Sequence, residues 1–128
     1  MAETRKIGLS NAEWRLMDFL WSQNPASVAD IVHYFDGITN WDRHVVIMML
    51  KRMEAKGAVA YKTVGRAKHY YPIIEKERSC VQETKDFLNR VYKGNLGLML
   101  TTMVKQEAIA KEELEELRRF LNEGEQDA

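Results

Sequence analysis

The chain has 128 residues, of which 45% are hydrophobic and 30% charged, and its formal net charge at pH 7 is zero. This length suits one domain, or a small domain followed by an oligomerisation segment. The single cysteine, Cys80, excludes an intrachain disulfide and a multi-cysteine zinc or redox site, and no apolar run approaches the ~18 residues of a membrane span. Since the first six residues also lack the apolar core of a signal peptide, we expect a cytoplasmic protein without direct membrane insertion.

The zero net charge hides a difference between the two parts of the chain. Residues 1–74 carry ten Lys and Arg against seven Asp and Glu, whereas residues 75–128 carry nine against twelve. Chance variation can produce so modest a basic excess. It lies, however, in the part that holds the elements described next, and these are typical of nucleic-acid binding.

Two short helices are predicted before Trp41. Ser10-Asn-Ala-Glu13 fits a capping box, and Asn24-Pro25 ends this helix because proline disfavours helical geometry at the preceding residue. A second helix starts at Ser27-Val-Ala-Asp30, and Asp36-Gly37 turns the chain after it. The apolar stripes are expected to be Trp14, Met17, Leu20 and Trp21 in the first helix, and Val28, Ile31, Val32 and Phe35 in the second.

A third helix is predicted between Trp41 and Val59. Asp42 can accept a hydrogen bond from the free amides of its first turn, and Gly57 can close its last turn in the left-handed conformation. The expected inner face is Val46, Met49, Leu50 and Met53. The expected outward face includes Arg43, His44, Ile47, Met48 and Lys51. Only two of these are ordinary solvent-facing charges, so we expect this face to meet a partner.

A β-hairpin is predicted directly after the third helix. Val59-Ala-Tyr-Lys-Thr-Val64 and Ala67-Lys-His-Tyr-Tyr-Pro72 are strand-like, and Gly65-Arg66 is turn-like. We expect this hairpin to pack by its tyrosines and to present its cations to phosphate, although a merely solvated hairpin is the alternative. The cations are Lys62, Arg66 and Lys68. Three helices followed by a hairpin is the order of a winged helix-turn-helix.

Beyond Pro72 the sequence predicts helices alone. One runs from about Glu75 to Tyr92, Gly94-Asn95 ends it, and two shorter helices follow, with a polar tail after Asn122 that is expected to fray. Roughly fifty residues in three amphipathic helices are too few to cover their apolar faces within one chain, so a homodimer is expected. The predicted dimerisation residues are Val81, Leu88, Val91, Leu96, Met99, Leu100, Met103, Leu117 and Phe120.

The expected fold is therefore mainly α with a small β-hairpin: a winged helix-turn-helix head in residues 1–74 and a helical dimerisation segment in residues 75–128. In order and spacing, the residues resemble the penicillinase-repressor family, the BlaI/MecI group of bacterial winged-helix repressors, over about residues 7–122. The resemblance rests on Leu9-Ser-x-Ala-Glu-Trp-x-x-Met17, Leu20-Trp21, Trp41, Leu50-Lys-Arg-Met-x-x-Lys-Gly57, Gly65-Arg-Ala-x-x-Tyr-Tyr-Pro72, Phe87-Leu88, Gly94 and Glu115-Glu-Leu-Arg118.

The resemblance implies a homodimer held by the C-terminal helices, with the third helix in the major groove of palindromic double-stranded operator DNA. It also implies a partner, a membrane sensor-protease system that lifts repression by cleavage in the C-terminal region. The Asn-Phe bond cut in the best-known members aligns with Thr102-Met103, which makes these two residues the candidate site of regulatory cleavage.

The helix that would read DNA departs from the family. Where members typically have threonines and a lysine, this chain has Val45, Ile47 and Met48, so apolar contact with thymine methyls replaces polar base contacts and a different operator sequence is expected. The predicted DNA-binding residues are Arg43, His44, Val45, Met48, Lys51, Lys62, Arg66 and Lys68.

The outward face of the third helix has a second interpretation. The chain could be a winged-helix protein-interaction module without sequence-specific DNA reading, with its apolar residues turned toward a protein. An enzyme is not expected, because no paired carboxylates, nucleophile-base pair or phosphate loop occurs. His33, His44, His69 and Cys80 fall on separate predicted elements, so neither a metal site nor a cofactor is expected.

Overall fold

The computed structural model describes residues 7–127 and the side chains of residues 7–124. The chain forms two compact units, the first ending at Glu83 and the second beginning at Thr84. This division lies inside a helix, and the boundary expected at residue 74 between DNA-binding head and dimerisation segment stays a prediction. Residues 1–6, for which the sequence predicts no signal peptide, lie outside the described part.

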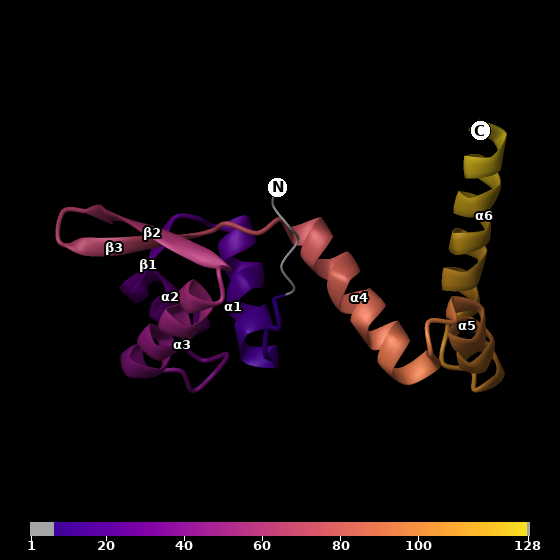
Figure 1. Ribbon diagram of the computed structural model, residues 1–128, viewed down its shortest axis with the longest axis horizontal. Coiled ribbons are helices and arrows are strands. Elements are labelled where there is room, and N and C mark those ends of the chain that lie inside the picture. Colours follow the sequence, from indigo (N-terminus) through magenta and orange to yellow (C-terminus); the bar gives the residue numbers. More distant parts are fainter. Residues whose placement is uncertain (1–6, 128) are drawn as a thin grey trace. The chain divides into compact units, whose positions relative to one another are not determined.

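The first unit contains three helices, a small sheet and the beginning of a fourth helix, which is the orange helix labelled α4 in Figure 1. Its elements are α1 (Asn11–Ser22), β1 (Ala26–Ser27), α2 (Val28–Phe35), α3 (Arg43–Ala55), β2 (Val59–Val64), β3 (Ala67–Pro72) and the first part of α4 (Lys76–Tyr92). The second unit holds the rest of α4, α5 (Leu96–Lys105) and α6 (Lys111–Asp127). The predicted class, mainly α with a small β-hairpin, is confirmed.

Polar side chains begin the helices of the first unit at the predicted positions. The Ser10 hydroxyl accepts a hydrogen bond from the Glu13 amide at 3.2 Å, and the Glu13 carboxylate accepts one from the Ser10 amide at 2.8 Å. α2 begins with the same capping box. Asp42 caps α3 by accepting from the Val45 amide at 2.9 Å, and Gly57, with φ +84°, follows its last turn.

The sheet has the strand order β1-β3-β2, with both pairings antiparallel. β2 and β3 form the predicted hairpin, called the wing below (residues 59–72), and Gly65-Arg66 is its two-residue turn. Gly65 has φ +65°, a left-handed value that glycine adopts without steric cost. The sequence does not predict β1, because two residues are too few to show alternation. This strand exists because it lies beside β3.

The core of the first unit lies between the helices and the face of the sheet that packs against them. This face is called the helix-side face below. All four predicted inner residues of α3 are buried, at 2% exposure or less. The other large apolar side chains of this core are Leu16, Met17, Phe19 and Leu20 of α1, Ile31 and Phe35 of α2, and Val59 and Tyr70 of the sheet. Trp14 and Trp21 are only half-buried, with ring centroids 5.9 Å apart, and Trp21 Nε1 donates to the Ile74 carbonyl at 2.9 Å.

The C-terminal helices cover few of their side chains. No described residue of α4 or α5 is buried. Gly94, with φ +82°, separates these two helices as predicted, and Asn95 caps α5 by accepting from the Leu98 amide at 2.9 Å. α6 continues to Asp127, so the predicted fraying after Asn122 is wrong. The Glu and Gln residues of this stretch favour a helix and outweigh the roughly 1 kcal/mol that an interior glycine costs.

Candidate nucleic-acid interface

The outward face of α3 combines cations with apolar side chains. Val45 is 37% exposed and Met48 is 41% exposed, while Ile47 is half-buried. The other exposed side chains of this face are Arg43, His44 and Lys51. Because the opposite face of α3 fills the core, these residues cannot turn inward. Such a face can bind phosphates with its cations and contact base edges with the side chains between them.

A buried carboxylate fixes the C-terminal end of α3 to α1. Glu13 is 1% exposed, and its Oε1 accepts from Lys56 Nζ at 2.5 Å. Lys56 Nζ also donates to the Gly8 carbonyl at 2.7 Å, and Arg52 Nε lies 3.5 Å from Glu13 Oε2. This network holds the end of α3 against the first turn of α1, and so it helps to set the direction of the helix.

The electrostatics of Glu13 follow from these contacts. Burial by itself would raise the pKa of the carboxyl, but the hydrogen bonds from Lys56 and the Ser10 amide, with the charges of Lys56 and Arg52, lower that pKa overall. The sequence identifies Glu13 only as a capping residue. The signal for burial was its spacing from Leu16 and Leu20, which places it on the apolar stripe of α1.

The wing does not bring its predicted cations together on one face. Tyr61 lies opposite Tyr70, Lys62 opposite His69, and Thr63 opposite Lys68. Successive residues of a strand point to opposite faces, and residues directly opposite each other share a face. Lys68 is therefore on the face of Tyr61, whose ring centroid lies 4.4 Å from Lys68 Nζ, and Lys62 is on the other face.

The predicted dimerisation residues are exposed or half-buried. Val81, Val91, Leu96, Leu117 and Phe120 are exposed, by 40% to 70% of their surface. The half-buried members are Leu88, Met99, Leu100 and Met103. These apolar side chains belong to α4, α5 and α6, and of the whole set Val81 alone belongs to the first unit.

The candidate cleavage residues lie inside a helix. Thr102 and Met103 are half-buried members of α5, and the Thr102 hydroxyl donates to the Leu98 carbonyl at 2.7 Å. The bond between them is therefore in helical geometry, with its backbone engaged in the hydrogen bonding of the helix.

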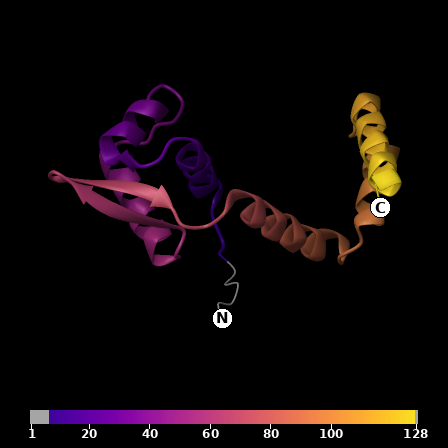
Figure 2. The same cartoon turned by 90° about the horizontal axis from the view of Figure 1, so that it is seen from above.

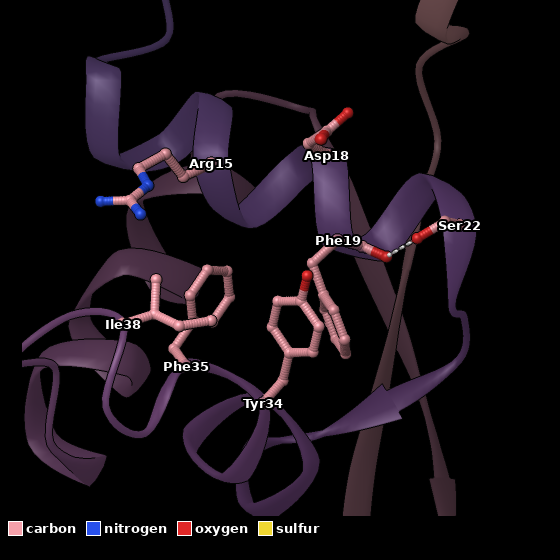
Figure 3. A pocket seen from close by; sticks show the side chains of 7 residues that line it. All are labelled: Arg15, Asp18, Phe19, Ser22, Tyr34, Phe35 and Ile38. Carbon is pink, nitrogen blue, oxygen red and sulfur yellow. Dashed lines mark hydrogen bonds between the residues drawn. The ribbon is translucent and has the colours of Figure 1, made fainter.

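A shallow pocket of about 240 Å³ lies between α1 and the end of α2. Figure 3 shows its aromatic side, where the Tyr34 ring lies 4.5 Å from that of Phe19, and the charged Arg15 and Asp18 above. The pocket is smaller than the ~300–1,000 Å³ typical of small-molecule sites, and we assign it no ligand. Within residues 7–127, no three His, Cys, Asp or Glu side chains are grouped to hold a metal ion. No helix of this range is long and apolar enough to cross a membrane.

Comparisons with known proteins show what the whole chain is similar to. The family model described as penicillinase repressor matches residues 9–123. The methicillin resistance regulatory protein MecI of Mammaliicoccus sciuri is 29% identical over 120 residues, which are 94% of this chain and 98% of that protein. The penicillinase repressor of Bacillus licheniformis is 27% identical over 115 residues, 90% of each chain.

Solved structures resemble the first unit. The solution structure of the DNA-binding domain of the repressor BlaI matches with a TM-score of 0.52 and 23% identity, over 58% of this chain and 90% of that one. The solution structure of the monomeric form of Bacillus licheniformis BlaI, in complex with the blaP half-operator, matches with a TM-score of 0.50 and 23% identity, over 57% and 89%. These likenesses confirm the predicted winged-helix head.

Proposed function

We propose, from the premise that the chain belongs to the penicillinase repressor family, that it represses transcription as a homodimer bound to palindromic operator DNA. The family is one of DNA-binding transcriptional repressors, so the chain is such a regulator and not an enzyme. Within this proposal, α3 reads the operator, the wing contacts the DNA backbone, and the C-terminal helices join two chains.

The observation that carries this proposal is the outward face of α3. Its exposed His44, Val45 and Met48 form a strip that is free to enter a major groove, which admits one α-helix. Arg43 and Lys51 lie on the same face, where they can bind the phosphates that flank the groove. Exposed apolar side chains on a reading helix suit the methyl group of thymine.

The homodimer is supported by the uncovered apolar side chains of α4, α5 and α6. Phe120 is 70% exposed and Leu96 53% exposed, although both are large and apolar. Large exposed apolar side chains recur along all three helices, and a surface rich in such side chains is typical of an interface. A second copy of the chain is the partner that also explains a palindromic operator, since a two-fold dimer presents two reading helices to two half-sites.

Regulation by proteolysis belongs to the same proposal. A membrane sensor-protease system would end repression by cutting the Thr102–Met103 bond, and so separate α6 from the head. Because that bond lies in α5, cleavage requires the helix to open locally first. A repressor that binds operator DNA works where the chromosome is, so we place it in the bacterial cytoplasm.

Selection from a randomised pool of double-stranded DNA tests the proposal. The full chain should enrich a palindromic motif, and its affinity for that motif should fall steeply with salt, with a slope of about −0.9 in log–log form for each phosphate contact. A chain that enriches no motif and forms no salt-sensitive complex would be the protein-interaction module instead, its apolar face of α3 turned toward a protein.

A further inference from the structure

The two lysines of the wing differ in their surroundings. Lys68 contacts the ring of Tyr61, and that ring lies beside the buried ring of Tyr70. Tyr70 is 6% exposed and belongs to the core of the first unit. Across the strands, the Tyr61 ring lies 5.5 Å from that of Tyr70, tilted by 53°. Lys68 Nζ lies 4.4 Å from the Tyr61 centroid, which is cation–π distance. The Lys68 ammonium group is thus connected through the Tyr61 ring to Tyr70 in the core.

Tyr70, Tyr61 and Lys68 lie on the face of the sheet that packs against the helices. Val59 and Tyr70 share one face of the wing with Tyr61 and Lys68, and both are buried against the helical core. α3 packs on β2 and α1 packs on β3. The face with Lys68 is therefore the helix-side face, and it continues past the core toward the tip of the wing.

The opposite face is turned away from α3. It carries Lys62 and His69, which lie opposite each other in the register. Figures 1 and 2 show that the tip of the wing extends beyond the helices of the first unit. α3 packs on the helix side of the sheet, so we expect a duplex against the outward face of α3 to lie on that side and to meet the helix-side face of the tip.

We propose that the wing contacts DNA with this face alone, and that Tyr61 is the positioning residue that holds Lys68 toward a backbone phosphate. The inference rests on the proposed function and deepens it by naming which of the two strand lysines of the wing, Lys62 or Lys68, binds phosphate. A lysine side chain has many rotamers, and ordering it before binding removes part of the entropy that a phosphate contact costs. Lys62 on the far face contributes no phosphate contact.

Salt titrations of the full chain on its selected operator test the inference. Lys68→Ala should flatten the log–log salt slope by roughly one unit, the loss of one phosphate contact, and should weaken binding to all sequences similarly. Lys62→Ala, which removes the same charge from the same hairpin, should leave the slope as it is. Lys105→Ala, at an exposed lysine on the side of α5 away from its predicted dimerisation residues, controls for the change of net charge alone.

The positioning role of Tyr61 has its own readout. Tyr61→Leu should weaken operator binding about two- to fivefold, the loss of one exposed cation–π contact. Tyr61→Phe keeps the ring beneath Lys68 and should bind like the wild type. Thermal unfolding at an unchanged midpoint in both variants would show that the wing is still folded, which is expected because Tyr61 is 37% exposed.

The outcomes separate the inference from the proposed function. A slope that flattens with Lys62→Ala, alone or as much as with Lys68→Ala, would overturn the one-face inference while operator binding stands. A Tyr61→Phe variant as weak as Tyr61→Leu would overturn the role of the ring. A wild-type chain without any salt-sensitive DNA complex would instead defeat the proposed function itself.

Discussion

At the residue scale, Glu13 is a charge buried to 1% exposure between the first turn of α1 and the last turn of α3. Transfer of a carboxylate from water to such a place is costly unless cations and donors surround it. Lys56, Arg52 and the Ser10 amide supply them. The capping box and the attachment of α3 to α1 therefore share one side chain, and a change at Glu13 affects both.

Replacement of this carboxylate should destabilise the head. Glu13→Gln keeps the shape of the side chain but loses the charge, and we expect the free energy of unfolding to fall by about 1–3 kcal/mol at pH 7. Glu54→Gln, at an exposed carboxylate of α3, is the matched control and should change that energy by less than about 0.5 kcal/mol. Urea unfolding followed by circular dichroism measures both.

The same variant should show a dependence on pH whose sign is set by the lowered pKa of Glu13. Unfolded, this carboxyl has the ordinary value of 4.5, and folded it is lower. Its stabilisation is therefore complete above pH 4.5 and is lost as the pH falls from there through the folded-state pKa. The gap between wild type and Glu13→Gln should narrow in that range. A gap that widens on acidification would mean that the pKa is raised by burial instead.

At the element scale, helices with polar caps and a clear apolar stripe could be predicted from the sequence closely. Asp42 and Gly57 bound α3 as expected, and its four inner residues are buried. The ends of both wing strands also agree with the prediction, because glycine, proline and alternation mark them. These signals depend only on residues that are close together in the chain, so a single sequence is enough to show them.

Features set by tertiary contacts could not be predicted in the same way. β1 forms only because β3 is beside it. The faces of Lys62 and Lys68 depend on register, whereas the sequence alone predicts phosphate contacts for both lysines without assigning either to a face. α6 extends beyond the end that the sequence predicts, because Glu and Gln favour helices although a polar composition is also typical of frayed ends. The roles of the candidate DNA-binding residues stay predictions.

The reading helix yields a prediction about sequence preference. Val45→Thr or Met48→Thr should change the motif that the chain enriches and leave non-specific affinity nearly intact, because phosphate contacts position a protein while groove-facing side chains specify the sequence. The lost methyl contact should cost about 1 kcal/mol, the low end of the range for one mismatched base pair. Selection with each variant measures this.

Val64→Thr is the control for that experiment. It makes one of the same substitutions at an exposed valine, 53% exposed, on the face of the wing opposite Lys68. Its enriched motif should equal that of the wild type. If the α3 variants also enrich the wild-type motif, then this face does not read bases.

At the scale of the whole molecule, the proposed function depends on two chains, because the C-terminal helices of one chain leave large apolar side chains exposed. Phe120→Ser should weaken the dimer by about 2 kcal/mol or more, close to thirtyfold in dissociation constant, if Phe120 is central to the interface. Arg119→Ser, on the side of α6 opposite Leu117 and Leu121, should leave the dimer unchanged. Sedimentation equilibrium of both variants decides between a central and a peripheral place for this side chain.

The mass of the protein–DNA complex tests the central claim most directly. Sedimentation of the wild-type chain, 14.9 kDa, with the palindrome that it selects should give a complex of two chains per duplex. A duplex with one half-site scrambled should bind much more weakly, because the second head then loses its specific contacts. Saturation at one chain per duplex, or equal affinity for the palindrome and the scrambled duplex, would contradict a dimeric operator-binding repressor.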